Sequence, residues 1–502
     1  MRQGYWDHCK KILSCKVLMF FVVFTTALCF GFTITNFSVG IDDPAAHHYL
    51  HTDGYGSMIQ QGRLFHVVYN LLTNALEFLP FFNDFLGASL LALSSLLFCA
   101  LFSYVTQGKL STVCMTVFCC VFISNPIIHE KYIYNLDVIA TTAAYCAVAL
   151  SLMYTYNLSA AKTNGIKAIL LLMVALSSYE TFGPMYFCGV FALFILRIVV
   201  NKEPVDRKIL FKDGLKFAAV LLCAYILYYS LVVSVQLFTG QFGIFHRVNA
   251  WAGQNPLTAF LKITRKLIRT FLLRPYLPLT LFTVFAVLGG ILFLVLSVKK
   301  RSPVLFVCFC GLFAGNLFIH YICGYVMYRA AQTFSLFIAF VALILVYVLC
   351  HSVYGKRIVI AGSVLLVLVQ AAELNRWFYN DYIRYQKESY MVHSIATEMA
   401  EQCDVSKPVI FTARYSKDYL SSEYYTGGQY NGKSAILWCC RAFDDPTTFH
   451  MRELFRMYGY DFLVAPTEKL ADKVLAEVEK LEEWPGDGYF WETEEYILVK
   501  IP

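Results

Sequence analysis

The sequence predicts an α-helical polytopic membrane protein with about eleven transmembrane helices and a small C-terminal α/β domain outside the membrane. Hydrophobic residues make up 58% of the 502 residues and charged residues only 15%, a balance far more apolar than that of soluble domains. The apolar residues also come in long runs, and a run of about 18 or more residues is long enough to cross a bilayer. These two observations together predict the fold class.

The first apolar run covers residues 17–37 and predicts a retained helix. Lysines precede it, and two aspartates follow it where a signal peptide would have a small-residue cleavage site. Later runs of similar length predict further spans over residues 85–105, 111–127, 138–156, 166–182, 184–200, 215–238, 276–298, 303–323, 331–350 and 358–374.

Charges in the loops predict the orientation of these spans. With a cytoplasmic N terminus, successive inside loops hold the basic residues that the positive-inside rule requires, namely Lys109, Lys162, Lys167, Lys202, Arg207, Lys208, Lys212, Lys299, Lys300, Arg301, Lys356 and Arg357. The outer face then carries residues 38–84, 129–137 and 240–275 and the chain after residue 374. Because this placement accounts for the net charge of +7, we expect no nucleic-acid partner.

Two outer segments predict helices that lie in the membrane interface. Residues 64–79 place leucine and valine on one face and polar residues on the other, so this helix would form a floor beside the first outer loop. The second segment is strongly basic, and its cations share one side of a helix opposite leucine and phenylalanine: Lys262, Arg265, Lys266 and Arg269. Contact with lipid phosphates explains such a helix on the outer face, and a misassigned span is the alternative.

The chain after residue 374 is more polar and predicts a separate unit. We expect domains over residues 1–374 and 375–502, since roughly 125 residues suffice for one small α/β domain. Within the second domain, the residue pattern predicts helices over 379–401 and 468–481 and strands over 408–412, 460–465 and 496–501.

The first outer loop gathers ionisable side chains at the membrane. Asp42 and Asp43 follow the first span, with His47 and His48 soon after. Because adjacent residues on an extended loop point in different directions, at most one aspartate acts as a base; the alternative is that Asp-Asp-Pro only ends a helix and turns the chain. His47 and His51 offer, with Asp43, ligands for a divalent ion, but no cysteine pattern accompanies them, so we favour neither a metal nor another cofactor.

Further ionisable residues fall on the same outer face. Glu130, Lys131 and Asp137 lie between two predicted spans, and a solvated loop is the alternative to a site. Glu180 lies near the outer end of an apolar span, where a charge is costly and therefore indicates a functional residue. The alternative for Glu180 is a structural pair with a cation such as Arg329.

The outer cations are candidates for binding an anion. Arg329 lies at the outer entrance of a span, where its planar guanidinium group suits a lipid phosphate, and Arg63, Lys131 and Arg247 share that face. The alternative is that Arg329 only extends toward the headgroups.

Several short motifs carry a family resemblance along nearly the whole chain. They are Asp42-Asp43 after the first span, Gln61-Gly62-Arg63, Tyr179-Glu180, Arg329 before an apolar helix, the tyrosine-rich residues 375–386, and residues 458–462. In these motifs the chain resembles the bacterial Gtr-type (type II) glucosyltransferases. Family members often have Tyr-Gln where this chain has Tyr179-Glu180.

The resemblance implies a GT-C-class glycosyltransferase in the bacterial plasma membrane. Such an enzyme moves a hexose from a polyprenyl-phosphate donor to a surface polysaccharide or glycolipid, and an acidic residue of the first external loop is its general base. We therefore expect a catalytic group of Asp42, Asp43 and Glu180. A positive surround would stabilise the departing phosphate: Arg63, Lys131, Arg247 and Arg329. The remaining candidates would bind the substrates: His47, His48, Glu130, Asp137 and Tyr179.

Two other functions use the same features differently. A transporter or flippase of lipid-linked sugars would use the intramembrane charges as a path, and it predicts polar residues through the depth of several spans and an internal repeat. The sequence instead collects its polar residues at one face and shows no repeat. A non-catalytic envelope assembly protein would work through the C-terminal domain and would not need the two aspartates.

Overall fold

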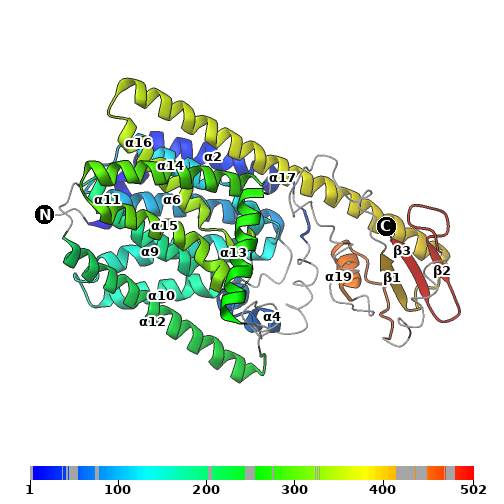
Figure 1. Cartoon of the computed structure of the whole chain (residues 1–502). Coiled ribbons are helices and arrows are strands. Elements are labelled where there is room, and N and C mark those ends of the chain that lie inside the picture. The colour runs from blue at the N-terminus through cyan, green and yellow to red at the C-terminus, as the bar shows by residue number, and fades with distance from the viewer. Residues whose placement is uncertain are drawn as a thin grey trace.

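Membrane-length helices make up most of the chain. In the computed structural model, the described residues are 4–36, 38–40, 43, 55–73, 79–201, 206–242, 255–273, 276–322, 324, 326, 328–413, 436, 449–467, 470 and 481–501. Figure 1 shows the long helices packed side by side in a bundle, with the N terminus at one end and the C-terminal strands beyond the other.

The helices follow the predicted apolar runs closely. The long ones are α2 (Lys16–Thr35), α6 (Pro80–Val105), α7 (Thr112–Ile123), α9 (Val138–Tyr156), α10 (Thr163–Ser178), α11 (Phe182–Val199), α12 (Arg207–Thr239), α14 (Leu277–Lys299), α15 (Pro303–Ile322), α16 (Phe334–Leu349) and α17 (Val353–Gln402). The others are α1 (Tyr5–Leu13), α4 (Gly56–Gln60), α5 (Leu64–Thr73), η1 (Pro126–Ile128), α8 (His129–Tyr132), η2 (Asn135–Asp137), α13 (Pro256–Leu273), η3 (Tyr328–Ala330) and α19 (Phe449–Met457).

In the part of the chain that the structure describes, 9 helical segments are long and apolar enough to cross a membrane. Two shorter apolar helices, α10 and α16, coincide with the predicted spans 166–182 and 331–350. Each predicted run thus corresponds to a described apolar helix, and the chain is a multi-pass helical membrane protein. The number of crossings stays a prediction.

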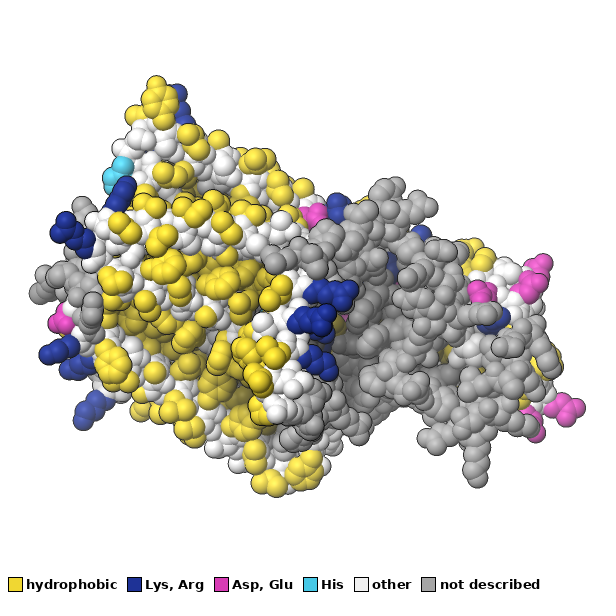
Figure 2. Space-filling view, in the orientation of Figure 1, with side chains coloured by type: hydrophobic (Ala, Val, Ile, Leu, Met, Phe, Trp, Pro, Cys, Tyr) yellow, Lys and Arg dark blue, Asp and Glu magenta, His cyan; other side chains and the backbone are white. Residues whose placement is uncertain are grey.

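The bundle has a buried centre and an apolar outer surface. α16 packs against α7 and α14, and its side chains from Phe334 to Ile344 are all buried. α12 instead exposes large apolar side chains such as Leu222 and Phe238. Figure 2 shows hydrophobic side chains covering one face of the bundle, which is the surface that a bilayer would cover.

Glycines let α11 and α15 approach closely. Gly311 and Gly315 are four residues apart and therefore lie on one face of α15, a spacing typical of close helix pairs in membranes. A Cβ atom on Gly311 would lie 2.4 Å from the Phe191 ring, and one on Gly315 would lie 2.6 Å from the Cys188 Sγ. Larger residues at these positions would force the two helices apart.

α17 continues without a break from the bundle into the C-terminal part. It is 50 residues long, and Figure 1 shows it running along the bundle and on to the strands. The predicted domain boundary at residue 374 therefore falls inside a helix. The apolar pattern ends there, but no proline or glycine occurs between Gly362 and the end of α17 to stop the helix.

The C-terminal part contains a three-stranded sheet of order β1-β3-β2. β1 (Val409–Ala413) pairs with β3 (Ile497–Ile501) in parallel, and β2 (Phe490–Glu492) pairs with β3 antiparallel. β1 and β3 match two predicted strands, whereas β2 and α19 were not predicted.

The third predicted strand, over 460–465, differs from the structure. It makes only an isolated bridge between Pro408 and Val464, in which the Val409 N–H donates to the Val464 carbonyl at 2.9 Å. The predicted helix over 468–481 lies mostly outside the described residues.

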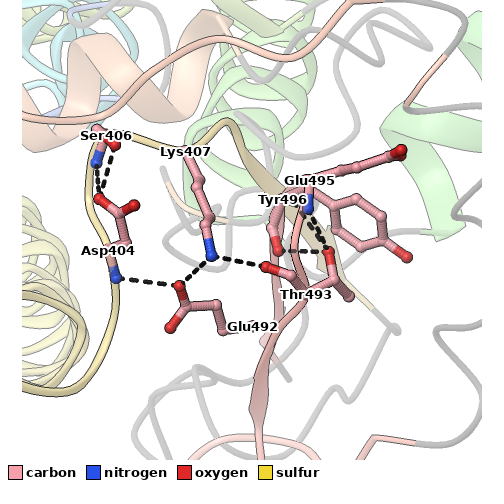
Figure 3. A network of polar contacts seen from close by, with 7 residues as sticks. All are labelled: Asp404, Ser406, Lys407, Glu492, Thr493, Glu495 and Tyr496. Carbon is pink, nitrogen blue, oxygen red and sulfur yellow. Dashed lines mark hydrogen bonds and ion pairs between the residues drawn. The ribbon is translucent and has the colours of Figure 1, made fainter.

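A polar network joins the end of α17 to the sheet, as Figure 3 shows. The Lys407 ammonium donates to Glu492 Oε1 at 2.6 Å and to the Thr493 carbonyl at 2.8 Å. The Asp404 N–H donates to the same Glu492 oxygen. The hydrogen bond from Lys407 lowers the pKa of Glu492, so this carboxylate stays charged and holds the connection between α17 and β1 against the β2–β3 hairpin.

The glycine contacts of α15 give a testable prediction. Gly315→Val places two methyl groups against Cys188 and Phe187, and overpacking of this kind costs about 1–3 kcal/mol. We expect a lower midpoint of thermal unfolding in detergent. Gly362→Val on α17 is the matched control, because no atom lies within 4 Å of its Cβ position. Equal midpoints for the two variants would contradict the close approach of α11 and α15.

Candidate functional site

Polar side chains gather at the end of the bundle that is nearer to the C-terminal strands. The chain segments that meet there are the short helices α5, α8, η2 and η3 and the turn between α10 and α11. Each follows or precedes a long apolar helix. The site is therefore built where the spans end.

Asp137 is the centre of a cluster of cations. Arg63 Nη1 lies 3.0 Å from Asp137 Oδ2. The charges of Lys131 and Arg329 also act on this carboxylate. Three basic side chains from three distant parts of the chain thus lie around one buried carboxylate, and Glu130 and Glu180 also act on members of this group.

Two tyrosine rings hold these cations in place. Lys131 Nζ lies 3.2 Å from the centroid of the Tyr179 ring, and Arg63 Cζ lies 5.3 Å from the same centroid. Arg329 Nη1 lies 3.2 Å from the Tyr134 hydroxyl oxygen. Ring faces attract cations, so the rings compensate part of the cost of removing the cations from water.

His66 lies beside Asp137, with its Nδ1 3.4 Å from Asp137 Oδ1. Burial lowers the pKa of His66 to about 4, because the charged imidazolium is disfavoured away from water. Its Nε2 lies 3.1 Å from the Ser178 carbonyl oxygen, and since a carbonyl only accepts, Nε2 carries the proton. The ring therefore links α5 to the end of α10.

Glu180 lies at the edge of this cluster. Its side chain is half-buried, and burial raises its pKa while the charge of Arg63 opposes that rise. The sequence-based alternative paired Glu180 with Arg329, but the cation that acts on it is Arg63. Glu180 therefore joins the cluster through Arg63.

Glu130 points to a different part of the site. It accepts a hydrogen bond from the Tyr276 hydroxyl at 2.6 Å, and the Tyr276 ring stacks on Trp377. Glu130 is 0% exposed and Asp137 8%, so the solvated-loop alternative for these residues is wrong.

Asp43 is buried and contacts the described residues 38–40. Its Oδ2 accepts from the Gly40 N–H at 2.7 Å. A Cβ on Gly40 would overlap the Ile133 carbonyl oxygen, so only glycine fits at position 40. The Arg384 guanidinium donates to the neighbouring Val39 carbonyl at 2.7 Å. The backbone of Val39 and Gly40, which Asp43 contacts, thus has close neighbours on two sides.

Asp84 is a site residue that the sequence analysis missed. Its carboxylate accepts from the Thr33 hydroxyl at 2.9 Å and from the Asn135 amide at 3.1 Å, and the charge of Asp43 acts on it. The available signal was its position just outside an apolar run, like that of Glu180. Asp84 was overlooked because it comes immediately before the predicted span.

α17 contributes a second set of missed residues. His129 Nε2 lies 2.7 Å from Asp381 Oδ2. Arg384 lies 4.0 Å from Asp381 and 3.9 Å from Glu388, and all three side chains are buried. Their spacing of three and four residues puts them on one face of a helix, which is a signal that the sequence offered.

The structure tests only part of the predicted site. It brings together Arg63, Lys131, Asp137, Tyr179 and Arg329, with Glu180 beside them. Four predicted residues lie outside the described residues: Asp42, His47, His48 and Arg247. Within the described ranges, no group of three or more His, Cys, Asp or Glu residues could hold a metal ion.

Comparison with known proteins identifies one family. A family profile described as glucosyl transferase GtrII matches residues 31–349. This range covers well over half of the chain and nearly all of the helical bundle, and it confirms the resemblance that the motifs indicate. No curated protein and no solved structure matches the chain.

The buried charges of α17 give a second prediction. Arg384→Met removes a buried cation from beside Asp381 and Glu388 together with the donor to the Val39 carbonyl, and breaking a buried pair typically costs about 3–5 kcal/mol. We expect a large fall in the thermal unfolding midpoint in detergent. Arg376→Met is the control, because Arg376 is 44% exposed in its pair with Glu373 and such pairs contribute about 0–1 kcal/mol. A small effect of both variants would contradict the structural role of Arg384.

Proposed function

Because the chain belongs to the GtrII glucosyl transferase family, we propose that it moves a hexose, glucose by the family's description, from a polyprenyl-phosphate carrier to a surface polysaccharide or glycolipid. The family match and the apolar helices make the chain a membrane glycosyltransferase, which needs a sugar donor and a bilayer. The carrier, the acceptor and the roles of single residues are the content of the proposal.

The observation that carries the proposal is the cation cluster around Asp137. A lipid-linked sugar is a phosphodiester with one negative charge, and breaking its bond to the sugar leaves a phosphomonoester that gains a second charge. Arg63, Lys131 and Arg329 lie where spans end, which is the depth of lipid phosphates. Cations fixed there in advance stabilise the departing phosphate more than the intact donor.

The proposed reaction is a direct displacement with inversion. Asp42 or Asp43 takes the proton of an acceptor hydroxyl, whose oxygen bonds to the anomeric carbon as the bond from that carbon to the phosphate oxygen breaks. The bonding electrons leave with the phosphate, and the proton stays on the carboxylate. The fixed position of Asp43 supports this role, because a base must be aligned with the hydroxyl before transfer.

Other side chains would hold the substrates. Glu180 and Glu130 would offer carboxylates to sugar hydroxyls, and Tyr179 would offer a ring. His47 and His48 belong to the same proposal. The proposed reaction requires no metal or other cofactor.

The proposal places the reaction on the outer face of a bacterial plasma membrane. The N terminus is then cytoplasmic, and the C-terminal part is extracytoplasmic. The opposite ends that the N terminus and the C-terminal strands occupy in Figure 1 support this arrangement.

Replacing the two aspartates singly tests the base. We expect one of Asp42→Asn and Asp43→Asn to lower kcat about 100- to 10,000-fold, because that is the usual contribution of a general base. The measurement is transfer of glucose from polyprenyl-phosphate glucose by the full-length protein in detergent. Asp7→Asn, an exposed change on α1, is the control. Full activity in both variants would place the base elsewhere.

Replacing Arg329 tests the phosphate site. We expect Arg329→Gln to lower kcat/KM for the donor about 10- to 100-fold, because hydrogen bonds to charged groups contribute about 1.5–3 kcal/mol. Arg329→Lys, which keeps the charge, should recover part of this loss. Lys299→Gln, at the cytoplasmic end, should leave the rate unchanged. An unchanged donor kcat/KM in Arg329→Gln would remove Arg329 from the donor site.

A further inference from the structure

α13 has a structural place that the transfer reaction does not explain. Figure 1 shows it running across the ends of neighbouring spans, at the end of the bundle that is nearer to the C-terminal strands. Its buried side chains Ala259, Ile263 and Leu267 face the bundle, where it packs on α14 and α15. The helix therefore lies along the rim of the bundle rather than through it.

Specific contacts fix α13 in this position. Its Phe260 ring stacks on Tyr321 of α15 with centroids 5.1 Å apart, and the Thr264 hydroxyl lies 2.9 Å from the Tyr321 hydroxyl. About two turns after Thr264 along the helix, Phe271 packs edge-on against Phe282 of α14. The direction of the outward face is thus set by the fold.

The outward face is strongly basic. A shallow surface groove on α13 is lined by Thr258, Leu261 and four exposed cations, Lys262, Arg265, Lys266 and Arg269. Among the residues that the structure describes, no carboxylate lies within ion-pair distance of any of the four. Figure 2 shows Lys and Arg side chains grouped in this region, at the edge of the hydrophobic surface.

Apolar side chains lie between and beside these cations. The side chains of Leu257, Leu261 and Ile268 are each more than half exposed at the rim of the lipid-facing surface. A helix that exposes cations together with large apolar side chains is typical of the membrane interface, where the apolar groups reach the acyl chains and the cations reach the phosphates.

The position of the four cations indicates which anionic groups they contact. Lys262 and Arg269 are seven residues apart, so the basic row extends over about 10 Å of helix and can reach more than one headgroup. Each cation near an anionic membrane surface contributes to attraction. We propose that α13 binds the phosphate groups of anionic phospholipids in the adjoining leaflet and thereby anchors the rim of the site at headgroup depth.

Photocrosslinking of the full-length protein in nanodiscs tests this proposal. In one variant a benzophenone amino acid replaces Leu261, which lies among the cations. In a second variant it replaces Phe238, an exposed apolar residue at the C-terminal end of α12. The discs contain phosphatidylglycerol and phosphatidylcholine. At position 261 we expect the share of phosphatidylglycerol among the crosslinked lipids to exceed its share in the disc about fivefold, which is the attraction that one surface cation alone would give. At position 238 we expect the two shares to be equal.

A variant with glutamine at positions 262, 265, 266 and 269 should abolish the enrichment, and added salt should reduce it in the unchanged protein. Equal crosslinking ratios at positions 261 and 238 would overturn the proposal. Displacement of phosphatidylglycerol from position 261 by stoichiometric polyprenyl-phosphate glucose would also overturn it, because α13 would then belong to the donor site. Crosslinking does not depend on turnover, so the result is independent of the proposed transfer reaction.

Discussion

The buried carboxylate of Asp137 holds together segments that are far apart in the sequence. Arg63 directly precedes α5, Lys131 comes from α8 and Arg329 from η3, and all three lie around it. Like charges repel strongly in a medium of low polarity, so the carboxylate among these basic side chains stabilises their close approach. The same arrangement holds these basic side chains in place.

A second set of buried contacts connects this cluster to α17. Asp381 binds His129, which is two residues before Lys131, and Arg384 binds the carbonyl of Val39, next to Gly40. α17 therefore supports the cation cluster on one side and the segment of Asp43 on the other. Because α17 also carries the chain to the strands, the C-terminal part and the bundle share one continuous helix.

The exposed side chains of each helix match the part of the membrane that the helix would contact. α12 exposes leucine and phenylalanine along its length, as expected for contact with acyl chains. α13, at the rim, combines such side chains with a basic row, as expected at the depth of the phosphates. The positive-inside rule disfavours a basic row on an outer face, and lipid phosphates there would offset the cost.

The sequence by itself determined the class of the protein and the position of its long helices. Hydropathy is a local property, so runs such as 138–156 and 303–323 predicted α9 and α15 within a few residues. Loop charges placed Arg63, Lys131, Asp137, Tyr179 and Arg329 on one face. Motif resemblance then indicated the family that the profile match confirms.

Only the tertiary structure decided which of these residues meet. Arg63 and Asp137 are 74 residues apart, and Arg384 and Val39 are 345 apart, so no local pattern joins them. The same reason explains why Asp84, His66 and Asp381 were missed as site residues, since each acquires its partner through packing between helices. The tertiary structure also decided that α17 continues past residue 374, because the buried contacts of Asp381 and Arg384 stabilise the helix where its apolar pattern ends.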